Sequence, residues 1–320
     1  MISEPDAAPK ASSAGTQLQR LLRMAEVQPP LRTAVVHPVD ALSLAGAVEA
    51  ARRGLIVPIL IGPIARVRAT AAAAGLDLTD LQLIDVQHSH EAAARACELA
   101  AKGEVAAIMK GALHTDELLD AVVSSGSGLR TDRRMSHVFV LDVPSYPRPL
   151  LVSDAALNIA PDLATKRDIV QNAIDCAHAM DIPEPKVAIL SAVETVNPKM
   201  ISTIDAAALC KMADRGQIVG GKLDGPLAFD NAISLESAKA KGINSTVAGQ
   251  ADILIVPDIE SGNMLAKQLF YLSNAQSAGI VMGARVPIML TSRSDPEASR
   301  LASCALAILV SQLKPSKYVR

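Results

Sequence analysis

The chain has 320 residues, of which 50% are hydrophobic and 20% charged, and its formal net charge is -2. This length exceeds one ordinary core and the composition argues against disorder, so we expect two domains or one large α/β domain. The small net charge gives no general attraction for nucleic acid or anionic lipid, and the scarcity of aromatic residues removes the stacking surfaces that single-strand binding requires.

The predicted elements alternate between strand and helix along the chain. Residues 1–15 are rich in Ala, Ser and Pro and are expected to form a loose leader. Strands are predicted at 33–36, 56–61, 81–86, 105–109, 138–143, 150–152, 187–190, 218–223, 253–256 and 286–291. Helices are predicted at 42–53, 91–102, 165–180, 203–214, 230–241, 261–275 and 296–313. This alternation predicts largely parallel α/β structure, and the break at 129–150 predicts a domain crossover, hence two sheets with a cleft.

The cysteines show no spacing that is typical of a metal site or a redox motif. Each of Cys97, Cys176, Cys210 and Cys304 lies in an Ala-rich segment of helical periodicity, and we interpret all four as reduced and buried.

The sequence shows no signal-peptide pattern and no apolar run near the ~18 residues of a membrane span. We therefore expect a cytoplasmic protein.

Polar clusters that follow apolar runs are the candidate sites, because ligands bind beyond the carboxyl ends of parallel strands. In the segment 290–296, Asp295 fits a helix N-cap and Pro296 the first helical position. The hydroxyl of Ser292 and the guanidinium of Arg293 would then converge with helix-start amides on a phosphate or an acyl phosphate. The alternative is a plain helix cap with a surface arginine.

Two further clusters also suit anions. Lys110 ends a predicted strand and is followed by Gly and a helix start, although a solvated lysine after a strand is the commoner arrangement. The second cluster lies at the predicted crossover and comprises Arg130, Arg133, Arg134, Ser136 and His137. Its arginines could hold the phosphates of a nucleotide-bearing ligand or form a solvated basic loop, and its histidine is more often structural than a base.

The remaining polar candidates follow later strands. Asp154 and Asn158 could orient a substrate or satisfy loop amides, and Asn263 belongs to a strand-to-helix turn whose acids could be helix caps. Gly283, at the end of Gly-Ile-Val-Met-Gly, permits close backbone approach to a ligand. The sequence contains no ATP phosphate loop, no dinucleotide fingerprint, no zinc motif and no hydrolase nucleophile elbow.

Taken together, from about residue 20 to the end, these clusters resemble the phosphate acetyl/butyryltransferase family. The matching motifs are Met109-Lys110-Gly111, Arg134-Met135-Ser136-His137-Val138, Ser153 to Asn158, Leu223 to Asp230, Pro257 to Asn263 and Thr291-Ser292-Arg293. The amino-acid sequences of these motifs resemble the butyryltransferase branch and its acetyl-transferring relatives more closely than the classical acetyltransferases.

The resemblance implies an architecture and an activity. It implies two α/β domains with a cleft between them, similar to the isocitrate and isopropylmalate dehydrogenases, with residues 1–146 plus 288–320 as the first domain and 147–287 as the second. It also implies a homodimer that transfers a short acyl group, from acetyl to butyryl, between coenzyme A and inorganic phosphate. Coenzyme A is then a substrate, and no metal or other cofactor is required.

The resemblance also assigns roles to residues. Ser292 would polarise the acyl carbonyl and Arg293 would bind the phosphate, with the other clusters binding substrate. Classical acetyltransferases have an aspartate in the following helix, thought to take the thiol proton, but Ser299 occupies that place here. Asp295 is therefore only a candidate base. The alternatives are a non-catalytic acyl-CoA-binding protein and, less favoured, a metal- and NAD-dependent decarboxylating dehydrogenase of the same fold.

Overall fold

The computed structural model describes residues 15–290 and 295–313. The strands within these residues are β1 (Leu31–Val36), β2 (Ile56–Gly62), β3 (Gln82–Asp85), β4 (Ala107–Lys110), β5 (Ser136–Asp142), β6 (Leu150–Ser153), β7 (Lys186–Leu190), β8 (Lys222–Leu227), β9 (Ile253–Ile255), β10 (Gln276–Met282) and β11 (Ile288–Met289). The helices are α1 (Thr16–Glu26), α2 (Ala41–Arg52), α3 (Ile64–Ala74), α4 (Ser89–Ala101), α5 (Thr115–Val123), α6 (Leu163–Ala179), α7 (Ile201–Asp214), α8 (Phe229–Ile233), α9 (Leu235–Ala240), α10 (Ile259–Leu272) and α11 (Glu297–Ser311).

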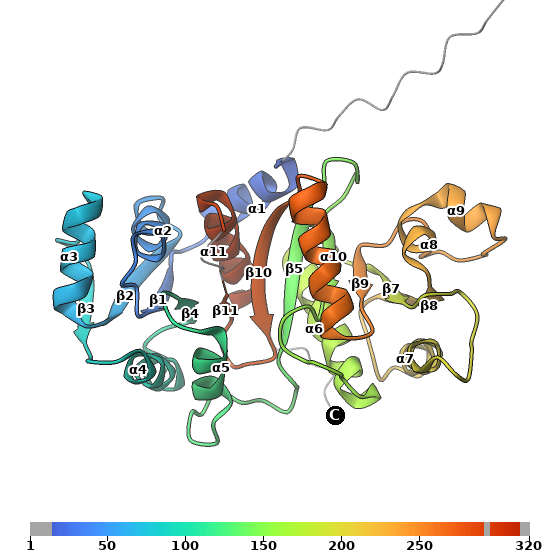
Figure 1. Cartoon of the computed structure of the whole chain (residues 1–320), viewed down its shortest axis with the longest axis horizontal. Helices are drawn as coiled ribbons and strands as arrows, with labels where there is room; N and C mark the ends of the chain where they lie inside the picture. Colours follow the sequence, from blue (N-terminus) through green and yellow to red (C-terminus); the bar gives the residue numbers. More distant parts are fainter. Residues whose placement is uncertain (1–14, 291–294, 314–320) are drawn as a thin grey trace, which may run out of the picture.

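The described strands form one mixed sheet instead of the two sheets expected. Its order is β3-β2-β1-β4-β11-β10-β5-β6-β9-β7-β8, which runs along the long axis of the molecule (Figure 1). The sheet is continuous because β5 and β10 pair through seven residues, one strand on each side of the predicted domain boundary. The α/β class is confirmed, and the division into two domains stays a prediction.

Strand direction reverses near the middle of the sheet. β5 is antiparallel to both of its neighbours, β10 and β6, whereas β1 to β4 and β11 are parallel to one another, as are β6 to β9. Consequently β10 and β6 end at the edge of the sheet where β5 begins. β4 runs in the same direction as β5, so its carboxyl end lies toward the opposite edge.

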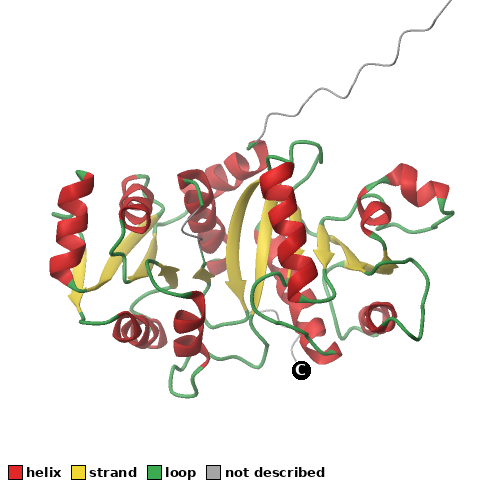
Figure 2. Cartoon of the chain, in the orientation of Figure 1, coloured by secondary structure: helices red, strands yellow, loops and turns green. Residues whose placement is uncertain are grey.

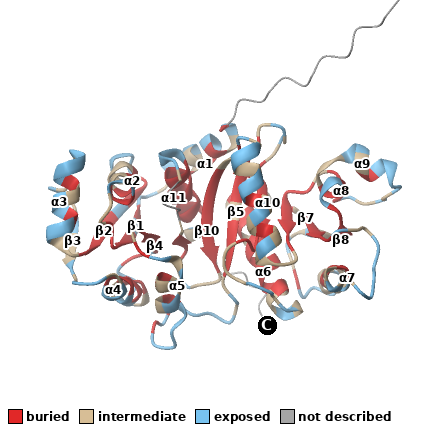
Figure 3. Cartoon of the chain, viewed as in Figure 1, coloured by how far each residue is buried: buried red, intermediate tan, exposed pale blue. Residues whose placement is uncertain are grey.

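Helices cover both faces of the sheet (Figure 2). One hydrophobic core cluster contains Val35 of β1 together with buried residues of α2, α6 and α11. A second cluster contains the neighbouring Val36 together with residues of α4 and α5. Successive strand residues therefore supply opposite faces, and a third cluster fills the space beneath α8, α9 and α10. The strands accordingly consist mostly of buried residues (Figure 3). No helix in the described ranges is both long and apolar enough to cross a membrane.

Several predicted elements differ in detail. α1 begins at Thr16, directly after the predicted leader, and buries Leu18 and Leu21. The predicted helix 230–241 is two helices, because Ser234 caps the second by accepting a hydrogen bond from the amide of Ser237. β10 was not predicted as a strand at all. The four cysteines are unpaired and lie on helices, as expected, but Cys210 is only partly buried, whereas the other three are buried.

Candidate active site

Three loops from distant parts of the chain meet at one edge of the sheet. Arg134 lies just before β5, Asp154 just after β6 and Gly283 just after β10, so the antiparallel pairing of these strands places them together. A pocket of about 1040 Å³ opens there between α5 and α6. Of the candidate residues, those that line it are Arg130, Arg133, Arg134, Asn158 and Gly283.

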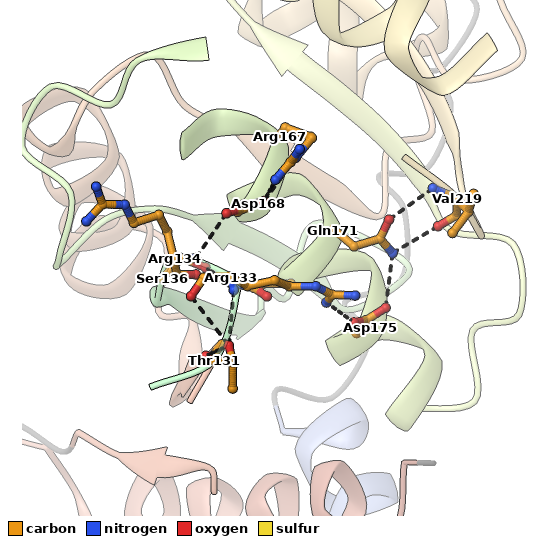
Figure 4. A network of polar contacts seen from close by, with 11 residues as sticks. Thr131, Arg133, Arg134, Ser136, Arg167, Asp168, Gln171, Asp175 and Val219 are labelled. Atoms are coloured by element: carbon orange, nitrogen blue, oxygen red, sulfur yellow. Dashed lines mark hydrogen bonds and ion pairs between the residues drawn. The ribbon is translucent and has the colours of Figure 1, made fainter. Parts of the chain in front are cut away.

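The loop that carries the arginines is fixed by one face of α6 (Figure 4). The backbone N–H of Arg134 donates to Asp168 Oδ2 at 3.0 Å, and Asn172 Nδ2 donates to the carbonyl oxygen of Arg134 at 2.9 Å. Asn172 Nδ2 also lies 2.9 Å from the hydroxyl oxygen of Ser136, which is fully buried. Ser136 thus supports the loop from within and does not line the pocket.

The arginines of the loop differ in their surroundings. The guanidinium of Arg133 forms an ion pair with Asp175 of α6, and Gln171 bonds both that carboxylate and the backbone of Val219. Arg130 and Arg134 are exposed, and Figure 4 shows the side chain of Arg134 extending away from Asp168. We infer that Arg133 mainly holds the loop on α6, whereas Arg130 and Arg134 present their charge to the pocket.

The second loop of the site is organised by a buried carboxylate. Asp154 is 2% exposed, and its oxygens accept hydrogen bonds from the backbone amides of His137, Ala156, Leu157 and Asn158 and from the side chain of Asn158. Burial raises the pKa of Asp154, while these hydrogen bonds oppose that shift. Its carboxylate is fully occupied inside the protein.

Two asparagines attach this loop to its neighbours. Asn158 donates to the carbonyl oxygen of Met135 at 2.9 Å, which joins the loop to the arginine loop. Asn263, on α10, donates to the carbonyl oxygen of Ala155 at 3.2 Å and lies outside the pocket lining. Asn158 is therefore positioned to contact a ligand, and Asn263 supports the loop.

His137 lies behind the pocket, in the core. It is 1% exposed, its ring packs edge-on against Phe139, and Nδ1 has no hydrogen-bond partner within the described part of the chain. Desolvation lowers the pKa of His137 to about 4. A buried, neutral imidazole suits a structural role better than direct contact with an anion.

Lys110 lies away from this pocket. It is buried at the end of β4, toward the opposite edge of the sheet, and does not line the pocket. The following Gly111 is required by close packing, since a β-carbon there would lie 2.3 Å from the carbonyl oxygen of Val36. β4 pairs with β11, which leads into the segment of Ser292 and Arg293. Ser292 and Arg293 themselves lie outside the described residues.

The start of α11 differs from the prediction by one residue. The N-cap is Pro296 and the helix begins at Glu297, so Asp295 precedes the cap and is not the N-cap itself. This shift arises because the carbonyl of Pro296 already accepts the amides of Ser299 and Arg300. Ser299 is 2% exposed, and its hydroxyl has no partner among the described residues.

Comparison with known proteins identifies the family of the chain. A family model described as Phosphate acetyl/butaryl transferase matches residues 87–308. The chain belongs to this family. The resemblance inferred from the sequence is therefore confirmed.

Individual members of the phosphate acetyl/butyryltransferase family match along nearly their whole length. A phosphate acetyltransferase of Rhizobium meliloti is 59% identical over 294 residues, covering 92% of this chain and 93% of the relative. A phosphate butyryltransferase of Clostridium acetobutylicum is 42% identical, covering 87% and 93%. The crystal structure of a branched-chain phosphotransacylase from Enterococcus faecalis superposes with a TM-score of 0.77 at 29% identity, covering 88% of this chain and 99% of that one.

Sequence reasoning predicted α6 as a helix but missed its polar residues, which support the candidate site of this chain. Asp168, Gln171, Asn172 and Asp175 recur at i, i+3, i+4 and i+7, so they form one polar stripe on α6. That stripe was the available signal, because a helix packed on a sheet normally turns an apolar stripe toward it. Arg167, which lines the pocket, was also missed.

In the described ranges, no three His, Cys, Asp or Glu side chains gather as a metal site would require.

Proposed function

We propose that this chain catalyses the reversible transfer of a short acyl group between coenzyme A and inorganic phosphate. The observation that carries this proposal is the match along nearly the whole chain to named phosphate acetyltransferases and butyryltransferases. In the direction of acyl-CoA synthesis, the thiolate sulfur attacks the carbonyl carbon of an acyl phosphate. A carbon–sulfur bond forms, the carbon–oxygen bond to phosphate breaks, and inorganic phosphate leaves with the electron pair. The thiol proton passes to a base, for which Asp295 is the candidate.

The two groups of candidate residues suit different parts of the substrates. Ser292 and Arg293, with Lys110, are proposed to bind the acyl phosphate, where a hydroxyl and two cations would stabilise the developing oxyanion and the leaving phosphate. Arg130 and Arg134 are proposed to bind the phosphate groups of coenzyme A in the pocket between α5 and α6. Because coenzyme A is long, one molecule can contact both regions, and proximity supplies part of the rate enhancement.

The wider features of the family are also proposed for this chain. We expect a cytoplasmic homodimer with two domains of the isocitrate dehydrogenase type and no metal or redox cofactor. Relatives named for acetyl, butyryl and branched-chain groups all match, so the preferred acyl group stays within that range. Neither the binding-protein alternative nor the dehydrogenase alternative is favoured by these relatives.

The test is phosphate-dependent release of free thiol from acetyl-, propionyl- and butyryl-CoA, with and without EDTA. We expect turnover that survives EDTA, and the ranking of kcat/KM identifies the preferred acyl group. The Arg293→Ala variant is expected to lose most of this activity. Absence of turnover with all three substrates, together with tight acyl-CoA binding, would instead establish a binding protein.

A further inference from the structure

Asp168 is a buried carboxylate to which the proposed mechanism gives no part. It lies near the start of α6 and is 6% exposed. Its Oδ2 accepts the backbone N–H of Arg134 at 3.0 Å, and its Oδ1 accepts hydrogen bonds from Arg167 Nε at 3.0 Å and Nη2 at 2.6 Å (Figure 4). One carboxylate therefore joins the main chain of the arginine loop to the guanidinium of a second arginine.

Both groups that Asp168 holds belong to the pocket wall. Arg134 and Arg167 line the pocket, and Asn172, one turn further along α6, fixes the carbonyl of Arg134. The main chain of Arg134 is thus held at its N–H and at its C=O. Only its side chain remains to respond to a ligand.

The charges around the pocket make this placement important. Besides its arginines, the pocket is lined by Asp116, Asp120, Asp132 and Asp162. Such a mixed lining gives no broad positive field, so an anion is bound only where guanidinium groups stand at the correct positions for bidentate contact. Phosphate binding in this pocket therefore requires residues that hold the guanidinium groups in position.

We propose that Asp168 is a positioning residue that sets Arg134 and Arg167 for the phosphate groups of coenzyme A. This inference rests on the proposed function. It favours coenzyme A over the acyl phosphate because the pocket, at about 1040 Å³, is far larger than one phosphate group. Lys110, which is proposed to bind the acyl phosphate, does not line this pocket.

The experiment is a double-mutant cycle with Asp168→Asn, Arg134→Ala and the double variant. The KM for coenzyme A is measured at saturating acetyl phosphate, and the KM for acetyl phosphate at saturating coenzyme A. Asp168→Asn is expected to raise the KM for coenzyme A by about 10- to 100-fold, with kcat and the KM for acetyl phosphate changed less than ~3-fold. The double variant should be less impaired than the product of the two single effects, because Asp168 acts partly through Arg134.

Asp205→Asn is the matched control. It removes the ion pair between Asp205 and Lys166, a residue of the same helix whose ammonium lies 2.7 Å from that carboxylate and outside the pocket lining. This control should lower the melting temperature but leave both KM values within ~2-fold. Calorimetric titration of each variant with coenzyme A, together with its urea unfolding curve, separates loss of binding from loss of folding.

The outcomes distinguish this inference from the proposed function. If the wild-type protein neither binds coenzyme A nor releases thiol, the proposed function fails. If the wild-type protein is active and Asp168→Asn keeps its affinity for coenzyme A, the positioning role is overturned. It is also overturned if the variant changes the KM for acetyl phosphate instead, or if the two substitutions are fully additive.

Discussion

A β-carbon placed on Gly283 would lie 2.6 Å from the carbonyl oxygen of Arg134. Gly283 has a φ of +90°, and its own carbonyl accepts a hydrogen bond at 2.6 Å from the hydroxyl of Thr131. The turn after β10 is therefore packed directly on the arginine loop. Only glycine satisfies both the backbone conformation and the close approach.

Replacement of Gly283 by Ala is expected to destabilise the protein by about 2–4 kcal/mol, combining a left-handed backbone with a steric overlap. The displaced arginine loop should also raise the KM for coenzyme A. Gly242→Ala is the control, because Gly242 has a φ of +67° but no atom within 4 Å of the position that an alanine methyl group would take. That control should lose only about 1–2 kcal/mol in urea unfolding. Equal losses for the two variants would contradict the contact with Arg134.

Asp154→Asn should destabilise the protein by about 3 kcal/mol, since an amide nitrogen would face backbone N–H groups that now donate to a carboxylate oxygen. Urea unfolding measures the loss. The comparison is Asp162→Asn, because Asp162 caps α6 by accepting the amide of Thr165, and asparagine is an equally good N-cap. A similar small effect at both positions would show that the loop does not depend on the Asp154 carboxylate.

His137 should make the protein less stable in acid. Its pKa is about 4 in the folded state, against the ordinary histidine value of 6.5 in the unfolded chain, so between these values the unfolded chain binds the proton and the folded chain does not. The stabilisation is therefore complete above pH 6.5, and about 3 kcal/mol is lost as the pH falls to 4. The free energy of unfolding of His137→Asn should fall less over this range. Parallel curves for the wild type and the variant would exclude this contribution.

Ser299→Ala is expected to leave kcat unchanged and to be neutral or to stabilise the fold by about 1 kcal/mol. The hydroxyl is buried with no hydrogen-bond partner in the described part of the chain, so its removal relieves a desolvation cost. Thermal unfolding and the thiol-release assay check both expectations. A loss of activity without a loss of stability would place this hydroxyl in the catalytic site.

The sequence predicted the fold class well because the apolar runs and the Ala-rich helices carry strong periodicity. It missed β10, whose central Gly279 weakens a strand pattern but is needed because a β-carbon there would lie 2.8 Å from His137 Nε2. It also predicted two sheets, since antiparallel pairing between β5 and β10 joins segments far apart in the chain and leaves no local signal.

The candidate site was predicted in part. The motif that contains Arg134 and the turn that contains Asn158 were identified because polar residues follow or precede apolar runs. The sequence did not distinguish residues that line the pocket with a free side chain from residues that support its loops. Arg133 is paired with Asp175, and Asp154 and His137 are buried. Those distinctions depend on α6 and on strand pairing, which bring together residues that lie far apart along the chain.

The unequal pairing of the strands has a mechanical consequence. Seven residue pairs join β5 to β10, whereas β10 and β11 share one pair, Val281 with Ile288. A hinge needs a boundary that few hydrogen bonds cross, so bending is expected between β10 and β11 and not between β5 and β10. Because α5 follows β4 on one side of this junction and α6 packs on β5 and β6 on the other, such bending would change the width of the pocket between the two helices.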